Sequence, residues 1–307
     1  MSPCYEAWAR GVADDPASVA LLDTLPAPKR QPNLVFSSAR FCGAETGEYP
    51  VFAAWLAENW TRVKQTCLTH ATQTNEAARC ATLLPALALL PGPLALIEVG
   101  ASAGLCLHPD GYSYQYAEPS GAVTKILHPV AGPSPVLLHC VASGPVPLPD
   151  ELPEVIWRAG IDLNPLDVTR QQDVDWLTAL IWPEHADRRE RLLAAVDVAR
   201  KEPVRIVRGD LNEQVTELVA QAPAGATVVV FHTAVLLYLD EDERGRFAET
   251  MAGLPARWLS NEAQGLVPGV LERLTEPPRS SSDFVLALDG IPLAFTQPHG
   301  RSIDWLA

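Results

Sequence analysis

Residues 94 to 105 constrain the fold of this chain more than any other stretch. An apolar run, Leu94 to Val99, contains one acid, Glu98, and is followed by Gly100-Ala101-Ser102-Ala103-Gly104. Small residues after an apolar strand let backbone N–H groups come close to a polar or anionic ligand. The stretch therefore predicts a strand that leads directly into a ligand-binding turn.

The turn fits two kinds of site. One is a nucleotide-type loop of the form E-x-G-x-x-x-G, and the other is the G-x-S-x-G nucleophile elbow of α/β-hydrolases, with Ser102 as the attacking group. A triad can be drawn in the chain order of that class from Ser102, Asp210 or Asp289, and His299. Hydrolases of that class have several strands before the elbow, whereas here the turn follows the first predicted strand. The loop is therefore the favoured interpretation, and a serine hydrolase that uses the GASAG segment stays an alternative.

The sequence before residue 92 is helical in pattern. Four segments carry apolar residues at three- and four-residue spacings, namely Tyr5 to Val12, Ser18 to Leu25, Tyr49 to Thr69 and Glu76 to Leu90. Pro91-Gly92-Pro93 ends the last of them just before the apolar strand. We expect a helical cap over residues 1–92 and a second domain over residues 93–307.

The second domain alternates short apolar runs with longer amphipathic ones. The runs that read as strands are Leu94 to Val99, Val155 to Ile161, Val204 to Val207, Thr227 to Phe231 and Arg257 to Leu259. The helical patterns between the later strands are Asp173 to Ile181, Glu184 to Lys201, Leu211 to Gln221 and Glu241 to Gly253. Such alternation predicts an α/β fold with a mostly parallel sheet that binds ligands at the carboxyl ends of its strands.

Two further features modify this sheet. Tyr112 to Tyr116 and Val136 to Val141 look like strands inserted after the first one, so we expect a β insertion at about residues 108–153. Asp289-Gly290 lies between two apolar runs, which is a strong signal for a two-residue hairpin. The sheet is therefore expected to end in an antiparallel C-terminal pair.

Composition narrows the class of partner. The formal net charge of −14 argues against nucleic acid, which requires a concentrated basic surface. The six cysteines contain no C-x-x-C pair, so their spacing encodes neither a zinc site nor a disulfide framework. The sequence also has neither a membrane-spanning apolar run nor a secretory signal pattern. We expect a cytoplasmic protein with a small-molecule partner and no metal, while the sequence leaves the oligomeric state open.

One acid follows or ends each of three predicted strands. Glu98 lies on the first strand, Asp162 ends the second, and Asp210 follows the third after Arg208-Gly209. Acids at neighbouring strand ends suit a ligand that carries an ammonium group, a ribose diol and an adenine amine. Each acid alone is also a common helix cap, so the series as a whole carries the prediction.

The chain resembles the class I S-adenosylmethionine-dependent methyltransferases, whose mostly parallel sheet has a Gly-rich loop after its first strand. More closely, it is similar over about Tyr5 to Trp305 to an uncharacterised bacterial family of unknown function. The segments that carry this likeness are Gln73 to Cys80, Glu98 to Leu107, Arg158 to Val168, Trp182-Pro183-Glu184, and Phe231-His232-Thr233 with Tyr238-Leu239. The resemblance implies a Rossmann-like fold. Pro109, however, follows too soon for a full first helix.

The methyltransferase resemblance implies a role for each predicted site residue. The backbone of Gly100, Ala101, Ser102 and Gly104 would line the methionine part of S-adenosylmethionine, and Glu98 would lie near its ammonium group. Asp162 would accept the ribose hydroxyls, and Asp210 would face the adenine amine.

Two further groups are candidates for substrate chemistry. His232 directly follows an apolar strand, where it could deprotonate an acceptor, and Tyr238 could wall the pocket. Gln73, Asn75, Glu76 and Arg79 form a polar cluster that could close the site as a lid. We expect a methyltransferase that acts on a small molecule, with a noncatalytic cofactor-binding protein on the same fold as the main alternative.

Overall fold

The computed structural model describes residues 2–306, which form two compact units. The first unit comprises Met1–Thr74 and Asp167–Leu193, and the second comprises Asn75–Leu166 and Ala194–Ala307. The boundary therefore falls after Thr74 rather than near residue 92. The physical reason is helix α5 (Cys80–Leu87), which is buried along its whole length and packs against strands of the sheet.

Helices form the regular structure of the first unit within the described residues. They are α1 (Pro3–Asp14), α2 (Pro16–Leu22), η1 (Ala27–Lys29), α3 (Pro32–Phe41), α4 (Tyr49–Thr69), α6 (Gln171–Leu180) and the part of α7 (Ala186–Ala199) up to Leu193. Pro3, Pro16 and Pro32 each stand at the first position of a helix, where the missing N–H costs no hydrogen bond. The core is aromatic, with the rings of Trp8 and Phe52 stacked 3.8 Å apart.

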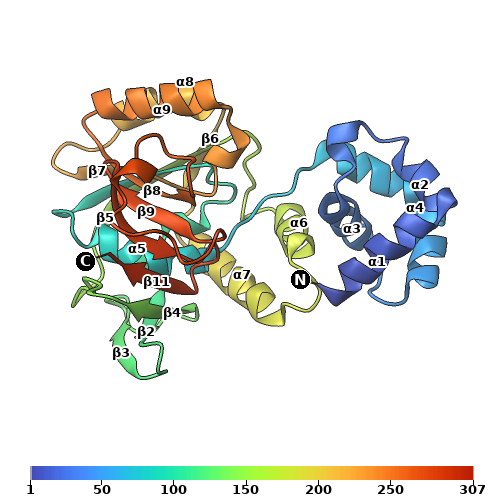
Figure 1. Ribbon diagram of the computed structural model, residues 1–307, viewed down its shortest axis with the longest axis horizontal. Helices are drawn as coiled ribbons and strands as arrows, with labels where there is room; N and C mark the ends of the chain where they lie inside the picture. Colours follow the sequence, from blue (N-terminus) through green and yellow to red (C-terminus); the bar gives the residue numbers. More distant parts are fainter. Residues whose placement is uncertain (1, 307) are drawn as a thin grey trace. The chain divides into compact units, whose positions relative to one another are not determined.

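One eleven-stranded sheet organises the second unit (Figure 1). Its strands, in chain order, are β1 (Leu94–Val99), β2 (Ser113–Ala117), β3 (Val123–Leu127), β4 (Leu137–Ser143), β5 (Val155–Asp162), β6 (Arg205–Arg208), β7 (Thr227–Thr233), β8 (Arg257–Ala263), β9 (Phe284–Leu288), β10 (Ile291–Thr296) and β11 (Ser302–Trp305). Their order in the sheet is β3-β2-β4-β11-β10-β9-β8-β7-β1-β5-β6. The prediction of a mixed α/β fold with a mostly parallel sheet is confirmed.

Five neighbouring strands, β6-β5-β1-β7-β8, run parallel to one another. Helices α8 (Leu211–Ala220) and α9 (Glu241–Gly253) cover one face of this block, where Val215 and Phe247 pack with Ile97 and Val230 (Figure 1). The side chain of Asn261 in β8 points to the other face, where its Nδ2 donates to Oγ1 of Thr82 in α5 at 3.4 Å. The block is therefore covered on both faces, as β-α alternation predicts.

The predicted hairpin is present, but the sheet does not end with it. Asp289 and Gly290 have φ values of 51° and 75°, the left-handed conformation that a two-residue turn between antiparallel strands requires. Beyond β10 the sheet continues through β11 to β4, β2 and β3, the strands inserted after β1. Pairing between β11 and β4 joins the insertion to the main sheet, which the sequence pattern did not indicate.

The connection that follows β1 contains only short turns, η3 (Leu105–Leu107) and η4 (Pro109–Gly111), before β2 begins. No full helix therefore follows β1, as the position of Pro109 predicts.

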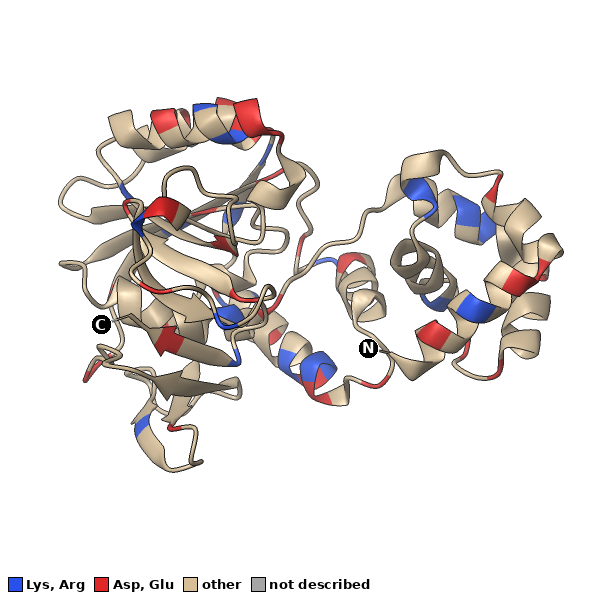
Figure 2. Cartoon of the chain, in the orientation of Figure 1, with Lys and Arg blue, Asp and Glu red and all other residues tan. Residues whose placement is uncertain are grey.

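Helix α7 (Ala186–Ala199) carries basic and acidic residues side by side, and so does α9 (Figure 2). Among the described residues, no helix is both long and apolar enough to cross a membrane.

Candidate functional site

The order of the parallel strands reverses between β1 and β7. From β1 the chain continues to β5 and β6 on one side, and later to β7 and β8 on the other. In open α/β sheets, ligands bind beyond the carboxyl ends of the strands at such a reversal. The predicted loop Gly100–Gly104 follows β1 at this point, so the topology favours it as the functional site.

Backbone hydrogen bonds fix this loop against the end of β5. The N–H groups of Gly100 and Ala101 both donate to the carbonyl of Ile161, at 2.8 and 3.0 Å, and Ser102 N–H donates to Oδ2 of Asp162 at 2.7 Å. Gly104 closes the loop by donating to the carbonyl of Ala101 at 2.7 Å.

Gly100 is required where the loop meets the connection after β7. Its φ is +74°, and a Cβ atom built there would lie 1.9 Å from Cγ2 of Val235. Any side chain at this position would both strain the backbone and collide with Val235. The loop after β1 and the turn after β7 are therefore packed directly against each other.

Glu98 is buried between β5 and β7, with Gly160 and Phe231 as its neighbours in register. Its Oε2 is fully buried and has no hydrogen-bond partner among the described residues. Burial raises the pKa of this carboxyl well above its usual value, and the nearby Cys106 acts in the same direction, whereas the Arg79 guanidinium opposes the change. Glu98 is thus an acid that a bound cation would stabilise in its ionised form.

Asp162 and Asp210 stand at the ends of β5 and β6, as predicted, and both hold local backbone. Oδ1 of Asp162 accepts the N–H of Asn164 at 2.7 Å, while its Oδ2 holds the loop after β1. Asp210 caps α8 by accepting the N–H of Asn212 at 2.8 Å. Both side chains are only half-buried, and Leu163 beside Asp162 is 62% exposed, so this part of the edge is open to solvent.

The polar cluster before α5 meets the same loop. Oδ1 of Asn75 accepts the N–H of Leu105 at 3.4 Å, and the side chain of Glu76 caps the short helix η2 (Ala77–Arg79). Nδ2 of Asn75 is buried and has no partner among the described residues. Gln73 lies before the division after Thr74, in the first unit, so only the other members of the cluster belong to the unit that carries the loop.

Arg79 is buried, with only 6% of its surface exposed, and it binds the end of β7. Its Nη1 donates to the carbonyl and to Oγ1 of Thr233, both at 3.0 Å, and its Nε donates to the carbonyl of Pro298. These contacts bring the segment before α5 against the carboxyl ends of β1 and β7. Asn75 and Arg79 thus hold the segment before α5 at this end of the strands, and the lid role stays a prediction.

His232 is fully buried on the α9 face of the sheet, because it lies two residues after Val230 on the same strand. Nε1–H of Trp258 donates to its Nε2 at 2.9 Å, and its Nδ1 lies 2.6 Å from Oε1 of Glu262. An indole N–H can only donate, so Nε2 accepts and Nδ1 carries the proton that Glu262 accepts. Both ring nitrogens are therefore engaged, which leaves no lone pair for the general-base role suggested by the sequence.

Ser102 and Tyr238 take different positions. Ser102 has a φ of 52°, and its buried Oγ has no hydrogen-bond partner within residues 2–306, so no base is in place to activate it. Asp289 accepts a hydrogen bond from Arg257 at the start of β8, at the end of the strands opposite to the loop, and Asp210 caps a helix. These positions give the hydrolase hypothesis no support. Tyr238 lies in η5 (Leu236–Tyr238) and is 70% exposed.

The sequence also matches a family model over residues 1–305, which is almost its whole length. The chain belongs to the DUF2332 family. The description of this family is "Uncharacterized protein conserved in bacteria". A search of curated proteins and a search of solved structures each returned no match.

Glu262 is the main residue of this DUF2332 chain that the sequence analysis missed. It is fully buried, and its Oε1 accepts from Nδ1 of His232 and from the backbone N–H groups of Val235 and Leu236, at 2.6, 2.8 and 3.3 Å. It therefore fixes the turn that packs on Gly100. Its signal was the run Ser260-Asn261-Glu262, three polar residues directly after the apolar end of a predicted strand.

Between residues 2 and 306, no group of three or more His, Cys, Asp or Glu side chains is placed to hold a metal ion. The six cysteines are free thiols, four of them buried.

Proposed function

We propose that this protein binds S-adenosylmethionine at the carboxyl ends of β1, β5 and β6 and transfers its methyl group to a small molecule. The observation that carries the proposal is the placement of Glu98, Asp162 and Asp210 at or just beyond the carboxyl ends of three adjacent parallel strands, beside the strand-order reversal. Next to the parallel block, antiparallel β9 lies between β8 and β10, which resembles the one antiparallel strand of the class I methyltransferase sheet. Strands β11, β4 and β2 also run against the block and have no counterpart in that resemblance.

Unpaired polar atoms at the loop fit the amino-acid part of this cofactor. Oε2 of Glu98, Oγ of Ser102 and Nδ2 of Asn75 are all buried without partners among the described residues. Such atoms are unfavourable unless a ligand or water pairs with them. Glu98 would accept from an ammonium group, whereas the hydroxyl and the amide would donate to a carboxylate.

The more open part of the edge fits the nucleoside. The half-buried carboxylate of Asp162 would accept ribose hydroxyls, and Asp210 would accept from an adenine amine. The exposed side chain of Leu163 lies next to Asp162 and offers an apolar surface for the flat base.

The bound cofactor would supply an activated methyl group. The residues of the chain would act mainly by position: the loop and the three acids hold the donor, and the segment carrying Asn75 and Arg79 excludes water from the end of β1. Such a transfer needs in-line placement of the acceptor more than a dedicated base. The proposal therefore does not depend on His232.

The test is calorimetric titration with S-adenosylhomocysteine, using Glu98→Gln as the variant and Glu249→Gln, an exposed site on α9, as the matched control. Wild type and control should bind equally. Glu98→Gln, which keeps shape but cannot ionise, should bind about 10- to 150-fold more weakly, as expected for about 1.5–3 kcal/mol from a charged hydrogen bond. Absence of binding at millimolar ligand in the folded wild type would refute the proposal.

Cofactor binding without methyl transfer is a second candidate function, and the enclosure of His232 favours it. The two functions differ in turnover. Incubation with labelled S-adenosylmethionine and a bacterial small-molecule extract should yield labelled product if the protein is a methyltransferase. Tight binding with no labelled product would favour the noncatalytic function.

A further inference from the structure

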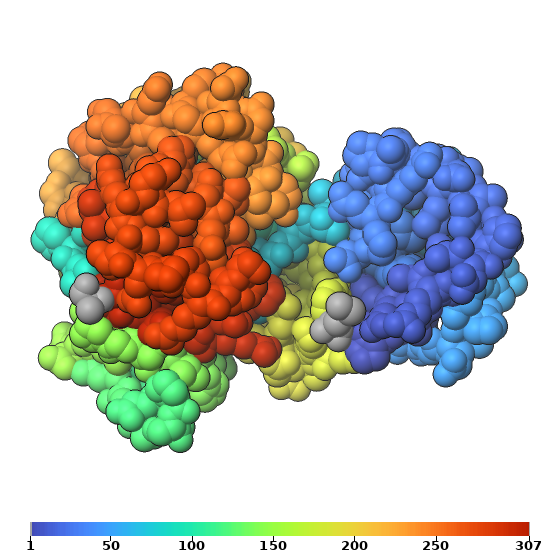
Figure 3. All heavy atoms as spheres, in the orientation of Figure 1, coloured from blue at the N-terminus to red at the C-terminus, as the bar shows by residue number. Residues whose placement is uncertain are grey.

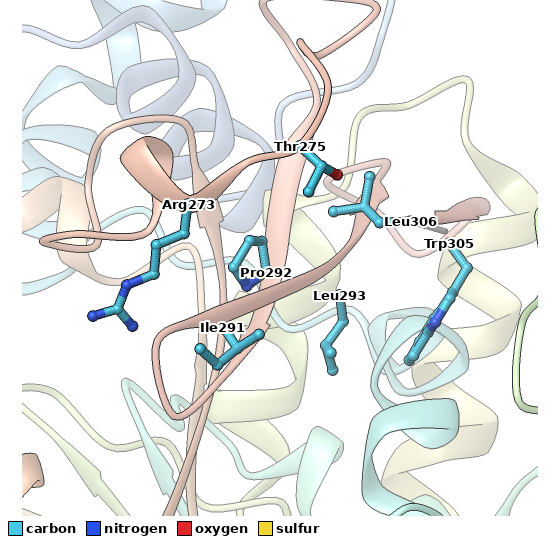
Figure 4. A pocket seen from close by; sticks show the side chains of 7 residues that line it. All are labelled: Arg273, Thr275, Ile291, Pro292, Leu293, Trp305 and Leu306. Carbon is cyan, nitrogen blue, oxygen red and sulfur yellow. The ribbon is translucent and has the colours of Figure 1, made fainter.

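A groove of about 320 Å³ lies on the second unit between strands β10 and β11 and the segment that follows η6 (Leu271–Arg273). Pro292, Leu293 and Leu306 supply apolar side chains to its middle. Figure 4 shows the Arg273 side chain at one end of this apolar stretch and the Trp305 ring at the other. The groove is therefore apolar along its length, with one cation at one end.

This groove lies near the amino-terminal ends of the parallel strands, whereas the loop after β1 lies at their carboxyl ends. Strand β10 runs in the same direction as β8, because β9 is antiparallel to both. Its first residue, Ile291, follows the Asp289-Gly290 turn, and Asp289 bonds to Arg257 at the start of β8. The groove is thus at the amino-terminal edge of the parallel strands, so a ligand in it would be separate from one at their carboxyl ends.

Arg273 is available to an anion. It is exposed, and its Nη1 donates to the carbonyl of Gly290 at 3.0 Å. Among the residues that the structure describes, no acidic side chain pairs with its guanidinium, although Arg257 and Arg279 nearby in sequence each have an aspartate partner. A guanidinium binds a carboxylate through two parallel hydrogen bonds.

The rest of the groove suits a flat apolar body. The Trp305 indole offers an aromatic face, and the volume lies at the lower end of the range for small-molecule sites. The C-terminal segments that carry these residues, drawn in red, form much of the visible face of the second unit (Figure 3).

We propose that this groove is a second small-molecule site, which binds an organic anion with a flat apolar body, such as an aromatic carboxylate. The carboxylate pairs with Arg273, and the ring system lies on Pro292 and Leu293 toward Trp305. The groove lies apart from the proposed methyl-donor site, so we expect the two ligands to bind at the same time.

The test uses 2-naphthoate as the probe and the uncharged 2-naphthalenemethanol as its control ligand, with binding to the full chain followed by NMR titration. Naphthoate should bind the wild type at least tenfold more tightly than the alcohol. Arg273→Gln should remove this preference, whereas Arg246→Gln, at an exposed arginine on α9, should keep it.

Three results would overturn the proposal. They are equal affinity for the acid and the alcohol, equal binding by wild type and Arg273→Gln, and displacement of naphthoate by S-adenosylhomocysteine, which would place the probe at the other edge. Naphthoate binding that persists in Glu98→Gln would separate this site from the methyl-donor site. A failure of S-adenosylhomocysteine to bind would leave the outcome of this test unchanged.

Discussion

Replacement of Gly100 by alanine tests whether the loop after β1 is packed on the turn after β7. Alanine at a φ of +74° is strained by about 1–2 kcal/mol. The new Cβ would also lie 1.9 Å from Cγ2 of Val235, and relief of such overpacking typically costs about 1–3 kcal/mol. Gly100→Ala should therefore lower the free energy of unfolding by about 2–5 kcal/mol.

Gly265 provides the matched control, because its φ is +76° and a Cβ there would meet nothing within 4 Å. Gly265→Ala should lose only the strain, about 1–2 kcal/mol. Urea unfolding of Gly100→Ala, Val235→Ala and the double variant separates the cost of the collision from that of the strained backbone. The double variant should be more stable than the sum of the two single changes predicts. Equal losses for the two glycine variants, or strict additivity, would refute the packing argument.

Two further predictions concern buried groups. Glu262→Ala leaves the donors of His232, Val235 and Leu236 without their acceptor, so it should lower the free energy of urea unfolding by about 3 kcal/mol or more. Glu249→Ala, on the surface, should change this free energy by less than about 0.5 kcal/mol. Similar values for the two variants would show that the Glu262 contacts contribute little. Burial, with help from Arg158, lowers the pKa of His108 from 6.5 to about 4. Between these values the unfolded chain takes up the proton first, so stability should fall by about 3 kcal/mol as the pH drops from about 7 toward 4. His108→Gln should remove this loss and His139→Gln, which is exposed, should not; a pH dependence unchanged in His108→Gln would contradict the assignment.

Local patterns predicted most of the elements in the second unit. The limits of β1 were predicted from a mostly apolar run before a glycine, and the hairpin from Asp289-Gly290, because both signals are local. Strand β11, by contrast, is four residues long and has one buried apolar side chain, Ile303, so its pattern was too short to detect. Its pairing with β4 joins segments about 160 residues apart, which no local pattern encodes.

The residues of the candidate site also fall into those that local sequence patterns predict and those that depend on distant partners. The acids Glu98, Asp162 and Asp210 were predicted to lie near neighbouring strand ends, because each lies in or within a few residues of an apolar run. The enclosure of His232 was not, since it depends on Trp258 and Glu262 from a neighbouring strand. Sequence position places a side chain at a strand end, but only the register of the next strand decides whether it faces solvent or a partner.

The most direct measurement for the proposed function is the heat of S-adenosylhomocysteine binding in two buffers that differ in ionisation enthalpy. Burial raises the pKa of Glu98, and a bound ammonium group would lower it again, so in titrations over a range of pH binding should release a proton wherever the free carboxyl is protonated. We predict binding whose heat depends on the buffer in the wild type, together with loss of that dependence in Glu98→Gln. No binding at millimolar ligand, or binding with the same heat in both buffers at every pH tested, would contradict the assignment of Glu98 and its loop as the methyl-donor site.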